Sequence, residues 1–335
     1  MLITVINRKE FLHEAINSVF HQSIDRSLFE VVVVSNFKVE VSNFPQDFRI
    51  TTLLMEGTLG ERLYAGIKSA KYEIIAFLDD DDTFNQEKLQ RVIEVFSEHP
   101  KLCYYHNNQR YVDRYLKHID YVRLVEKRTQ LLKDSSLLID VQTNLSAIKE
   151  AIEMRGDFNL SSIAVKREDF MEYLPLLKQI DGLSDGFFFW ISLVNMGQIM
   201  IDSQKLTNYR LHELNTSGQT NFFNKIIWLE KEICTFNIIL NFMDNRHLPN
   251  NVYVNLKGSI SLHKYEYLLL MYIFGNTSRV TTIKGIAMVL FFGRGQSHTL
   301  KHRVILFALI RIVSSKLAKN LYQKIRKNNY PNSAE

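Results

Sequence analysis

Short β-branched and apolar runs alternate with helical patterns through the first hundred residues, and this alternation restricts the chain to a few types of fold. We expect strands at residues 3–6, 30–34, 50–55 and 73–78, and helices at residues 11–21, 60–70 and 87–98. Strands that alternate with helices indicate a parallel sheet built from βαβ units. The four valines at 31–34 support this, because a strand covered on both faces reads as an unbroken β-branched run. The predicted fold class is α/β with a mostly parallel central sheet.

The rest of the chain divides into a further α/β segment and a helical remainder. Strands are expected at 102–106, 160–165 and 198–202, and helices at 168–177 and 186–196. The stretch 120–153 is polar with a helical pattern and has no sharp motif. Beyond about residue 218 the pattern is helical to the end. We therefore predict two domains, an α/β domain over 1–217 and an α-helical, basic region over 218–335.

The composition is that of a globular protein with a substantial core, because 46% of the 335 residues are hydrophobic and 23% are charged. Its two cysteines, Cys103 and Cys234, have no CxxC or Cys/His spacing. We therefore expect neither a disulfide framework nor a structural zinc site, and a reducing compartment. Residues 1–8 have too short an apolar part for a signal peptide and are expected to form the first strand.

Four consecutive aspartates, Asp79 to Asp82, directly follow the apolar run 74–78. Two like charges about 4 Å apart repel by ~1 kcal/mol in water and by about 4 kcal/mol near a protein surface, so a folded cluster needs a compensating partner. A hard divalent cation with oxygen ligands supplies one. In open α/β sheets, ligands bind at the carboxyl ends of strands, where this cluster is expected. A second interpretation is that one aspartate, or Thr83 in a capping box with Gln86, caps the following helix.

Positive charge is concentrated toward the C-terminal end, although the net charge of the whole chain is only +5. Between Glu266 and Glu335 there is no acidic residue, and the basic residues there are Arg279, Lys284, Arg294, Lys301, Arg303, Arg311, Lys316, Lys319, Lys324, Arg326 and Lys327. The apolar runs 286–292 and 304–310 are far shorter than the ~20 residues of a membrane-spanning helix. We expect helices that lie on an anionic membrane surface, where each Lys or Arg contributes about 1 kcal/mol. A basic face that packs on its own domain or on a partner is the alternative.

Several motifs in a fixed order resemble the nucleotide-sugar glycosyltransferases of family 2, which have the GT-A fold. The resemblance covers approximately residues 2–217. It rests on Thr4-Val-Ile-Asn-Arg8, on A-I-N-S-V-F-H-Q at 15–22, on the glycine-containing segment 57–73, on F-L-D-D-D-D at 77–82, on Ser184-Asp185 with Trp190 and Gly197, and on Tyr209-Arg-Leu-His212 with Asn215 and Ser217. In this family the last of these segments closes over the phosphates of the donor.

The resemblance implies a GT-A, Rossmann-like domain and a metal-dependent inverting glycosyltransferase of the hexosyltransferase type. Such an enzyme moves a sugar from a UDP- or GDP-sugar to a hydroxyl of a lipid-linked or membrane-proximal glycan acceptor. By resemblance, the general base is Asp185, the nucleotide-sugar contacts are Asn7, Arg8, Ser35, Asn36, Arg62, Asp79, Asp80 and Arg210, and the ligands of Mn²⁺ or Mg²⁺ are Asp81 and His212. A metal neutralises the departing diphosphate, and a carboxylate across the sugar takes the proton of the attacking hydroxyl.

The sequence departs from the family pattern around the nucleotide. Val34-Ser35-Asn36 stands where paired acids are usual, so neutral groups would hold the base and ribose. Tyr64 stands where Asn is usual, and Ser184 where Glu is usual. The expected location is the cytoplasmic side of the cell membrane, as a peripheral protein without a transmembrane span, and no nucleic-acid partner is expected.

Two other functions match parts of the sequence. Asp79-x-Asp81-x-Thr83 after an apolar strand also resembles the nucleophile motif of haloacid dehalogenase-like phosphohydrolases, with Asp79 as the nucleophile. The downstream Lys and acidic pair of that family are not evident. The second alternative is a catalytically inactive glycosyltransferase-like membrane scaffold. Retention of Asp81, Asp185 and His212 together argues against it.

Overall fold

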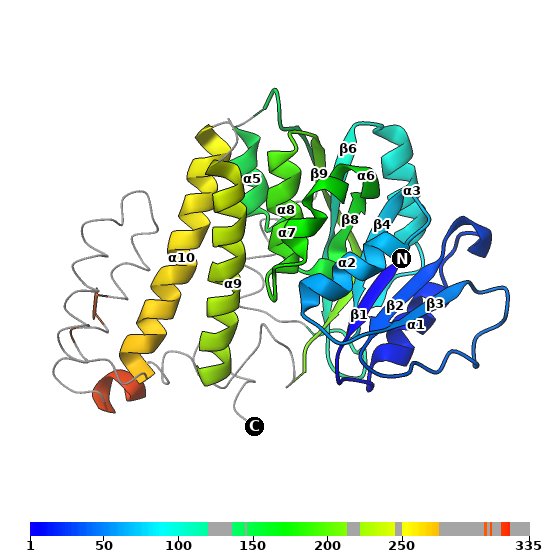
Figure 1. The fold of residues 1–335 in the computed structure, drawn as a ribbon, viewed down its shortest axis with the longest axis horizontal. Coiled ribbons are helices and arrows are strands. Elements are labelled where there is room, and N and C mark those ends of the chain that lie inside the picture. Colours follow the sequence, from blue (N-terminus) through cyan, green and yellow to red (C-terminus); the bar gives the residue numbers. More distant parts are fainter. Residues whose placement is uncertain are drawn as a thin grey trace. The chain divides into compact units, whose positions relative to one another are not determined.

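The computed structural model describes residues 1–119, 136–144, 146–212, 222–244, 250–274, 305–306, 309 and 316–321. The chain separates into two compact units. The first comprises Met1–His212 with Arg246–Val252, and the second comprises Glu213–Asn245 with Tyr253–Glu335. All residues predicted for the active site lie in the first unit, whose strands are drawn in Figure 1.

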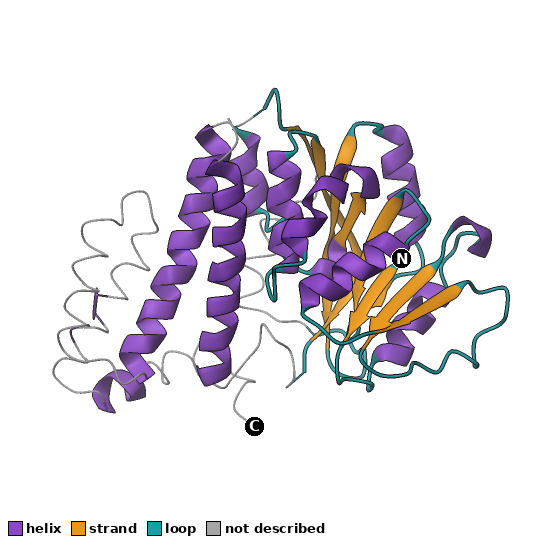
Figure 2. Cartoon of the chain, viewed as in Figure 1, coloured by secondary structure: helices purple, strands orange, loops and turns teal. Residues whose placement is uncertain are grey.

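A mixed sheet organises the first unit (Figure 2). Its strands within the described ranges are β1 (Leu2–Val5), β2 (Val31–Ser35), β3 (Ile50–Leu54), β4 (Ile74–Asp79), β5 (Thr83–Phe84), β6 (Leu102–Val112), β7 (Leu137–Asp140), β8 (Ile163–Lys166) and β9 (Gln198–Arg210). They lie in the order β3-β2-β1-β4-β8-β6-β9-β5, and β7 also pairs with β9. The half β3-β2-β1-β4 is parallel throughout, whereas β8 runs antiparallel to both β4 and β6. The predicted α/β fold is confirmed.

Helices cover both faces of this sheet. Helices α1 (Leu12–Phe20) and α3 (Lys88–Glu98) share one apolar cluster with alternate residues of the strands, including Ile3, Val33 and Leu78. Helices α2 (Leu59–Ser69) and α8 (Ser184–Val194) lie on the opposite face. There the Phe188 ring lies 4.5 Å from that of Phe77. The two layers bury the strands from both sides, as the valine run of β2 predicts.

Within the described ranges, shorter helical segments lie in the connections between strands, and all but η1 follow β7. They are η1 (Arg26–Leu28), α5 (Ala147–Glu153), η2 (Leu160–Ser162), α6 (Arg167–Phe170), η3 (Met171–Tyr173) and α7 (Leu174–Leu177). The helix expected at 168–177 is thus three short pieces. The stretch 120–153, expected to be helical, contains helix α5 where it is described, but also strand β7, because Leu137 to Asp140 pair antiparallel with β9.

Two of the helix-capping interpretations are wrong. Thr83 lies in β5 and its hydroxyl accepts a hydrogen bond from Asn208, while α3 begins later, at Lys88, after Glu87, which makes no side-chain cap. Asp82 does not cap α3 either, because its Oδ1 accepts the backbone N–H of Arg210 at 2.9 Å. Pairing with the distant strand β9 takes these residues away from the helix.

A capping box that the sequence analysis did not identify begins helix α2. Thr58 Oγ1 accepts the backbone N–H of Glu61 at 3.2 Å, and Glu61 Oε2 accepts that of Thr58 at 2.9 Å. Two N–H groups that lack helical partners are thereby satisfied. This fixes the start of α2, the helix that carries Arg62.

The second unit is helical where it is described, with α9 (Phe222–Asp244) and α10 (Asn250–Phe274). Ile226, Leu229 and Leu270 form a small apolar cluster between these two helices. In the described ranges, no helix is both long enough and apolar enough to cross a membrane. Most of the basic segment after residue 274, including the runs 286–292 and most of 304–310, lies outside the described residues.

Candidate active site

The carboxyl ends of neighbouring parallel strands bring several predicted residues to one edge of the sheet. Strand β1 lies between β2 and β4, which end at Ser35 and Asp79. Asn7 and Asn36, which follow β1 and β2, are linked by two hydrogen bonds. The backbone N–H of Asn7 donates to Asn36 Oδ1 at 3.0 Å, and Asn36 Nδ2 donates to Asn7 Oδ1 at 2.7 Å. The hydroxyl of Ser35 donates to the carbonyl of Phe37. Neutral polar groups therefore line this part of the edge.

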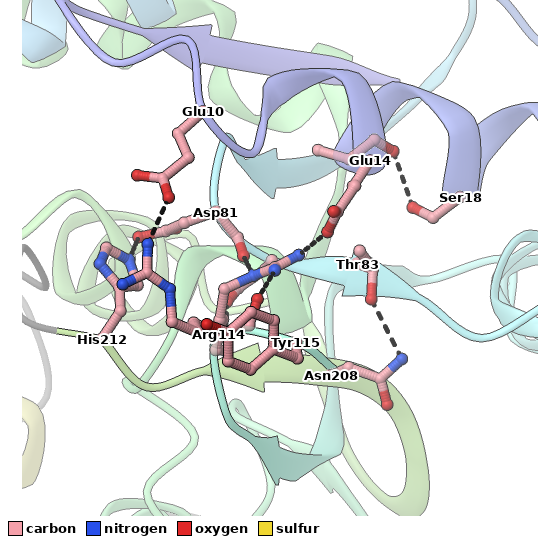
Figure 3. A network of polar contacts seen from close by, with 12 residues as sticks. Glu10, Glu14, Ser18, Asp81, Thr83, Arg114, Tyr115, Asn208 and His212 are labelled. Carbon is pink, nitrogen blue, oxygen red and sulfur yellow. Dashed lines mark hydrogen bonds and ion pairs between the residues drawn. The ribbon is translucent and has the colours of Figure 1, made fainter. Parts of the chain in front are cut away.

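Arg8 holds the aspartate run from the adjacent loop. Its guanidinium donates to both carboxylate oxygens of Asp80, at 2.7 and 2.5 Å, and its NH2 lies 2.9 Å from Asp81 Oδ2. The same oxygen of Asp81 lies 3.0 Å from His212 Nε2, a contact drawn in Figure 3. The structure thus brings together Asp81 and His212, which the family resemblance pairs as metal ligands.

The aspartates crowd one another in a buried setting. Burial, together with Asp82 and Asp81, raises the pKa of Asp79 well above its usual range. Burial and Asp81 raise the pKa of Asp82 to about 8, although hydrogen-bond donors around it act in the opposite direction. In the described part of the chain, Asp82 Oδ2 has no hydrogen-bond partner. The raised pKa values of Asp79 and Asp82 show that Arg8 does not offset the repulsion and burial of the run, so a bound cation would favour the ionised carboxylates.

Arg210 is fully buried and braces the site from β9. Its Nε donates to the Asp81 carbonyl at 2.6 Å, its NH1 donates to the Arg114 carbonyl at 2.6 Å, and its NH2 lies 2.5 Å from Glu14 Oε2. These contacts give Arg210 a structural part in holding the aspartate run, and its predicted contact with the nucleotide stays a prediction.

A short turn ahead of β8 links the aspartate run to Asp185. The backbone N–H of Asp79 donates to Ser161 Oγ at 2.9 Å. Two residues before Ser161, the N–H of Asn159 donates to Asp185 Oδ2 at 3.0 Å. Asn159 takes a left-handed conformation, φ 69°, and its side chain accepts the N–H of Ser161. Asn adopts left-handed backbone angles more readily than most residues, so the residue at 159 suits the conformation of the turn.

Asp185 lies in the first turn of α8 and is half-buried. Burial raises its pKa to about 6, and Asp157 acts in the same direction. The N–H groups of Gly186 and Asn159 oppose the shift by bonding to its two oxygens. A carboxylate with a pKa near 6 is ionised at neutral pH and is still basic enough to accept a proton.

Arg62 is a buried cation on α2. Its NH1 donates to the carbonyl of Gly57, and its Nε has no partner in the described part of the chain. Burial lowers its pKa, while Asp181 and Glu56 oppose that shift. A guanidinium with spare hydrogen-bond donors is suited to an anionic ligand.

The sequence analysis missed the polar groups beneath the turn. The Thr207 hydroxyl donates to the Ser161 carbonyl at 3.1 Å and accepts from Asn107 Nδ2 at 3.1 Å. Lys88 Nζ donates to Asn107 Oδ1 and, at 3.3 Å, to the Ser162 carbonyl. Isolated Lys, Asn and Thr residues give no sequence signal for this arrangement. Only the Asn-Leu-Ser-Ser sequence at 159–162 hints at a polar turn.

Comparisons with known proteins agree with this architecture. Residues 1–155 match the family model for glycosyl transferase family 2. An uncharacterized glycosyltransferase of Nostoc sp. (strain PCC 7120) is 32% identical over 105 residues, which are 29% of this chain and 32% of that protein. One from Haemophilus influenzae (strain Rd) is 30% identical over 111 residues, 32% of this chain and 37% of that protein. The matches thus span about a third of the length of these curated relatives.

Solved structures share the fold over nearly the whole chain. S. aureus TarS 1–349 in complex with UDP-GlcNAc has a TM-score of 0.57 at 14% identity, covering 96% of this chain and 90% of that one. The mannosyltransferase PcManGT from Pyrobaculum calidifontis, in complex with GDP-Man and Mn²⁺, has a TM-score of 0.53 at 12% identity, covering 95% and 85%. At such low identity these likenesses show the fold alone. Residues 1–155 are therefore similar to glycosyl transferase family 2, and the chain has the fold of these glycosyltransferase structures.

Proposed function

We propose that this protein transfers a sugar from a nucleotide-diphosphate sugar to an acceptor hydroxyl with inversion, using Asp185 as general base and a divalent metal at Asp81 and His212. The observation that supports this best is the turn at residues 159–162. Ser161 of this turn bonds to Asp79, and Asn159 of the same turn bonds to Asp185. The turn therefore positions the aspartate cluster and the proposed base relative to each other. The proposed catalytic domain is residues 1–217, followed by the helical region 218–335.

The donor would lie along the carboxyl edge of β1, β2 and β4. Asn7, Ser35 and Asn36 offer neutral donors and acceptors for the base and ribose. Asp79 and Asp80 would contact the ribose and the phosphates, and Arg8 and Arg62 would face the negative diphosphate. TarS was solved with UDP-GlcNAc and PcManGT with GDP-Man, which supports a UDP- or GDP-sugar donor here. Arg210 would act through the aspartates it braces.

The residues present fit a divalent metal. Asp81 Oδ2 and His212 Nε2 lie 3.0 Å apart at the edge of a carboxylate-rich cluster. In the described ranges, no group of three or more His, Cys, Asp and Glu side chains could hold a metal by itself, so we propose that diphosphate oxygens complete the coordination. A His nitrogen favours Mn²⁺ over Mg²⁺, which prefers oxygen ligands. The bound ion would neutralise charge on the leaving diphosphate.

Asp185 would carry out the proton transfer. As the acceptor oxygen bonds to the anomeric carbon, the bond from that carbon to the diphosphate oxygen breaks, and the diphosphate leaves with the electron pair. The acceptor proton passes to Asp185, whose pKa of about 6 suits a base at neutral pH. Attack from the side opposite to the leaving group inverts the anomeric centre. Arg8 would stay beside the aspartates and stabilise the released charge.

The acceptor is proposed to be a lipid-linked or membrane-proximal glycan. The basic C-terminal region would bring the protein to the cytoplasmic face of an anionic membrane, because its segment after Glu266 has eleven basic residues and no acidic one before Glu335. Co-sedimentation with vesicles that contain or lack anionic lipid tests this part. Equal binding to both kinds of vesicle would contradict it.

The experiment for the donor is a thermal-shift screen of UDP-GlcNAc, UDP-glucose and GDP-mannose with Mn²⁺ or Mg²⁺, followed by a nucleotide-release assay. A ligand that binds only the folded state raises the melting temperature. Asp81→Ala should abolish the metal-dependent shift and the nucleotide release. Asp47→Ala is the matched control, because Asp47 is an exposed aspartate paired with Arg26. Metal-dependent turnover by Asp81→Ala would refute the metal assignment.

The same assay separates the alternatives. A phosphohydrolase would form a phosphoryl-enzyme on Asp79, detectable by intact-protein mass spectrometry. An inactive scaffold would bind nucleotide without releasing it from a nucleotide sugar. Nucleotide release with no mass increase on the protein supports the glycosyltransferase.

A further inference from the structure

We infer that the acceptor group that reacts is an uncharged sugar ring, bound beside Asp185 by Arg155, Asp157 and Phe158. This inference rests on the proposed function, since it assigns the acceptor half of the same site. The three residues belong to the loop that leads into Asn159, whose N–H holds Asp185. The base and the acceptor subsite would therefore be parts of one continuous segment.

The side chains of this loop form a compact group. Arg155 Nε donates to Asp157 Oδ1 at 3.0 Å, and the guanidinium lies 5.2 Å from the centre of the Phe158 ring. The Phe158 ring lies 5.5 Å from that of Tyr209, which in turn lies 5.6 Å from that of Tyr111. The side chains of Arg155 and Asp157 keep 35% and 19% of their surface exposed. A ligand can therefore reach the charged pair and the adjoining aromatic surface.

Buried groups hold the loop in place from below. The Tyr104 hydroxyl donates to the Gly156 carbonyl at 2.6 Å, and His106 Nε2 bonds to the Phe158 carbonyl at 2.7 Å. Tyr104 and His106 are both almost completely buried. Arg155 itself has φ 57°, a left-handed conformation that costs free energy and persists only where the surrounding structure enforces it. The loop is thus preorganised, as a binding site requires.

The charges of the group argue against an anionic ligand. Arg155 is already paired with Asp157, and Asp185 adds a second negative charge nearby. A phosphate or carboxylate placed here would meet two carboxylates and one cation, and like charges at ~4 Å cost about 4 kcal/mol near a protein surface. A neutral ligand avoids that cost.

A sugar ring matches the chemistry that remains. In the described part of the chain, the NH1 and NH2 groups of Arg155 make no hydrogen bond, so they can donate to hydroxyl oxygens. Asp157 can accept from a neighbouring hydroxyl. The Phe158 ring offers an apolar, electron-rich face to the C–H side of the ring. Paired polar groups next to one aromatic face fit a polyhydroxyl ring better than a simple alcohol or a peptide.

The test is saturation-transfer NMR of the full chain with UDP, using methyl glycosides of glucose, galactose, mannose and N-acetylglucosamine as probes. We expect saturation on the C–H protons of at least one probe. It should fall at least fivefold in Phe158→Leu and in Arg155→Met, which keep apolar volume while removing the ring or the donors. Tyr72→Leu is the matched control, since Tyr72 lies 5.5 Å from Arg49 in a similar cation–aromatic pair before β4. It should leave the signal unchanged.

The outcomes separate this inference from the proposed function. Absence of saturation for every probe, or equal saturation in Phe158→Leu and the unaltered protein, would overturn the acceptor subsite, whatever the nucleotide-release assay shows. Saturation that depends on Phe158 and Arg155 supports the subsite even if no donor is hydrolysed. Circular dichroism of each variant shows whether a lost signal reflects a lost fold. If Phe158→Leu unfolds, the Arg155→Met result decides.

Discussion

Asp79 and Asp185, far apart in the sequence, are joined through a single turn. Asp79 donates its N–H to Ser161 Oγ at 2.9 Å, and Asp185 accepts the N–H of Asn159 at 3.0 Å. The two carboxylates have different proposed roles, one toward the donor and one toward the acceptor. A shift of this turn would therefore move both halves of the site relative to each other.

Removal of the hydroxyl beneath the turn should reduce turnover more than stability. Thr207→Val keeps the side-chain shape but loses the bond to the Ser161 carbonyl. We expect kcat for nucleotide release to fall roughly 10-fold, because small displacements of reacting groups are costly. The donor KM should stay within about twofold, and the free energy of unfolding should fall by about 1 kcal/mol.

Ser192→Ala is the control for that variant. Ser192 is also fully buried, and its hydroxyl donates to the Phe189 carbonyl at 2.6 Å within α8. It should lose a similar free energy of unfolding with kcat unchanged. Equal losses of kcat in the two variants would show that loss of any buried hydroxyl lowers kcat. The proposed role of the turn in positioning the site would then be wrong.

Asp185→Asn should be inactive and yet more stable at alkaline pH. Burial raises the pKa of Asp185 to about 6, above the value of about 3.9 in an unfolded chain. Between these two values the unfolded state is ionised and the native carboxyl is not, so stability is lost as pH rises through 6. At pH 8 the variant should unfold with a free energy higher by on the order of 1–2 kcal/mol, and at pH 3 the difference should vanish.

Urea unfolding at several pH values measures that difference. The unaltered enzyme should lose activity as pH falls below about 6, where Asp185 becomes protonated. A stability difference that does not change between pH 3 and pH 8 would show that the carboxyl has an ordinary pKa in the folded protein.

Lys88 should make stability increase with pH in the alkaline range. Burial lowers its pKa to about 7, and Asp202 only partly opposes this. Between pH 7 and about 10 the unfolded chain holds a proton on this lysine that the native protein has released, so the native state gains stability as pH rises. Lys88→Met should lack this gain. Unfolding curves of the two proteins at pH 7 and pH 9.5 should diverge, and parallel curves would count against a neutral buried lysine.

The capping box of α2 should behave as one unit. Thr58→Ala and Glu61→Ala should each lower the free energy of unfolding by about 1 kcal/mol, since each removes a partner of an N-terminal N–H group. Because the two bonds are reciprocal, the double variant should cost less than the sum of the single variants. Strict additivity in denaturant unfolding would show that the two bonds act independently.

The amino-acid sequence alone predicted most of the alternating strands and helices of the first unit and the position of the aspartate run at the end of β4. Apolar runs of the strand type and helical periodicity are local properties of the chain, and β1, β2, β4 and α2 lie close to their predicted ranges. The carboxyl edge of a parallel sheet follows from that order, which is why Asn7, Asn36 and Asp79 could be expected together.

The partners of the individual polar groups follow from the tertiary structure. Thr83 and Asp82 bond to β9 instead of capping α3, and Arg210 is enclosed by protein groups. Ser161 emerged as the partner of Asp79 only because β8 lies beside β4 in the sheet. Such contacts join residues far apart in the chain. They depend on which strands pair and on which side chains become buried, and no local pattern encodes either.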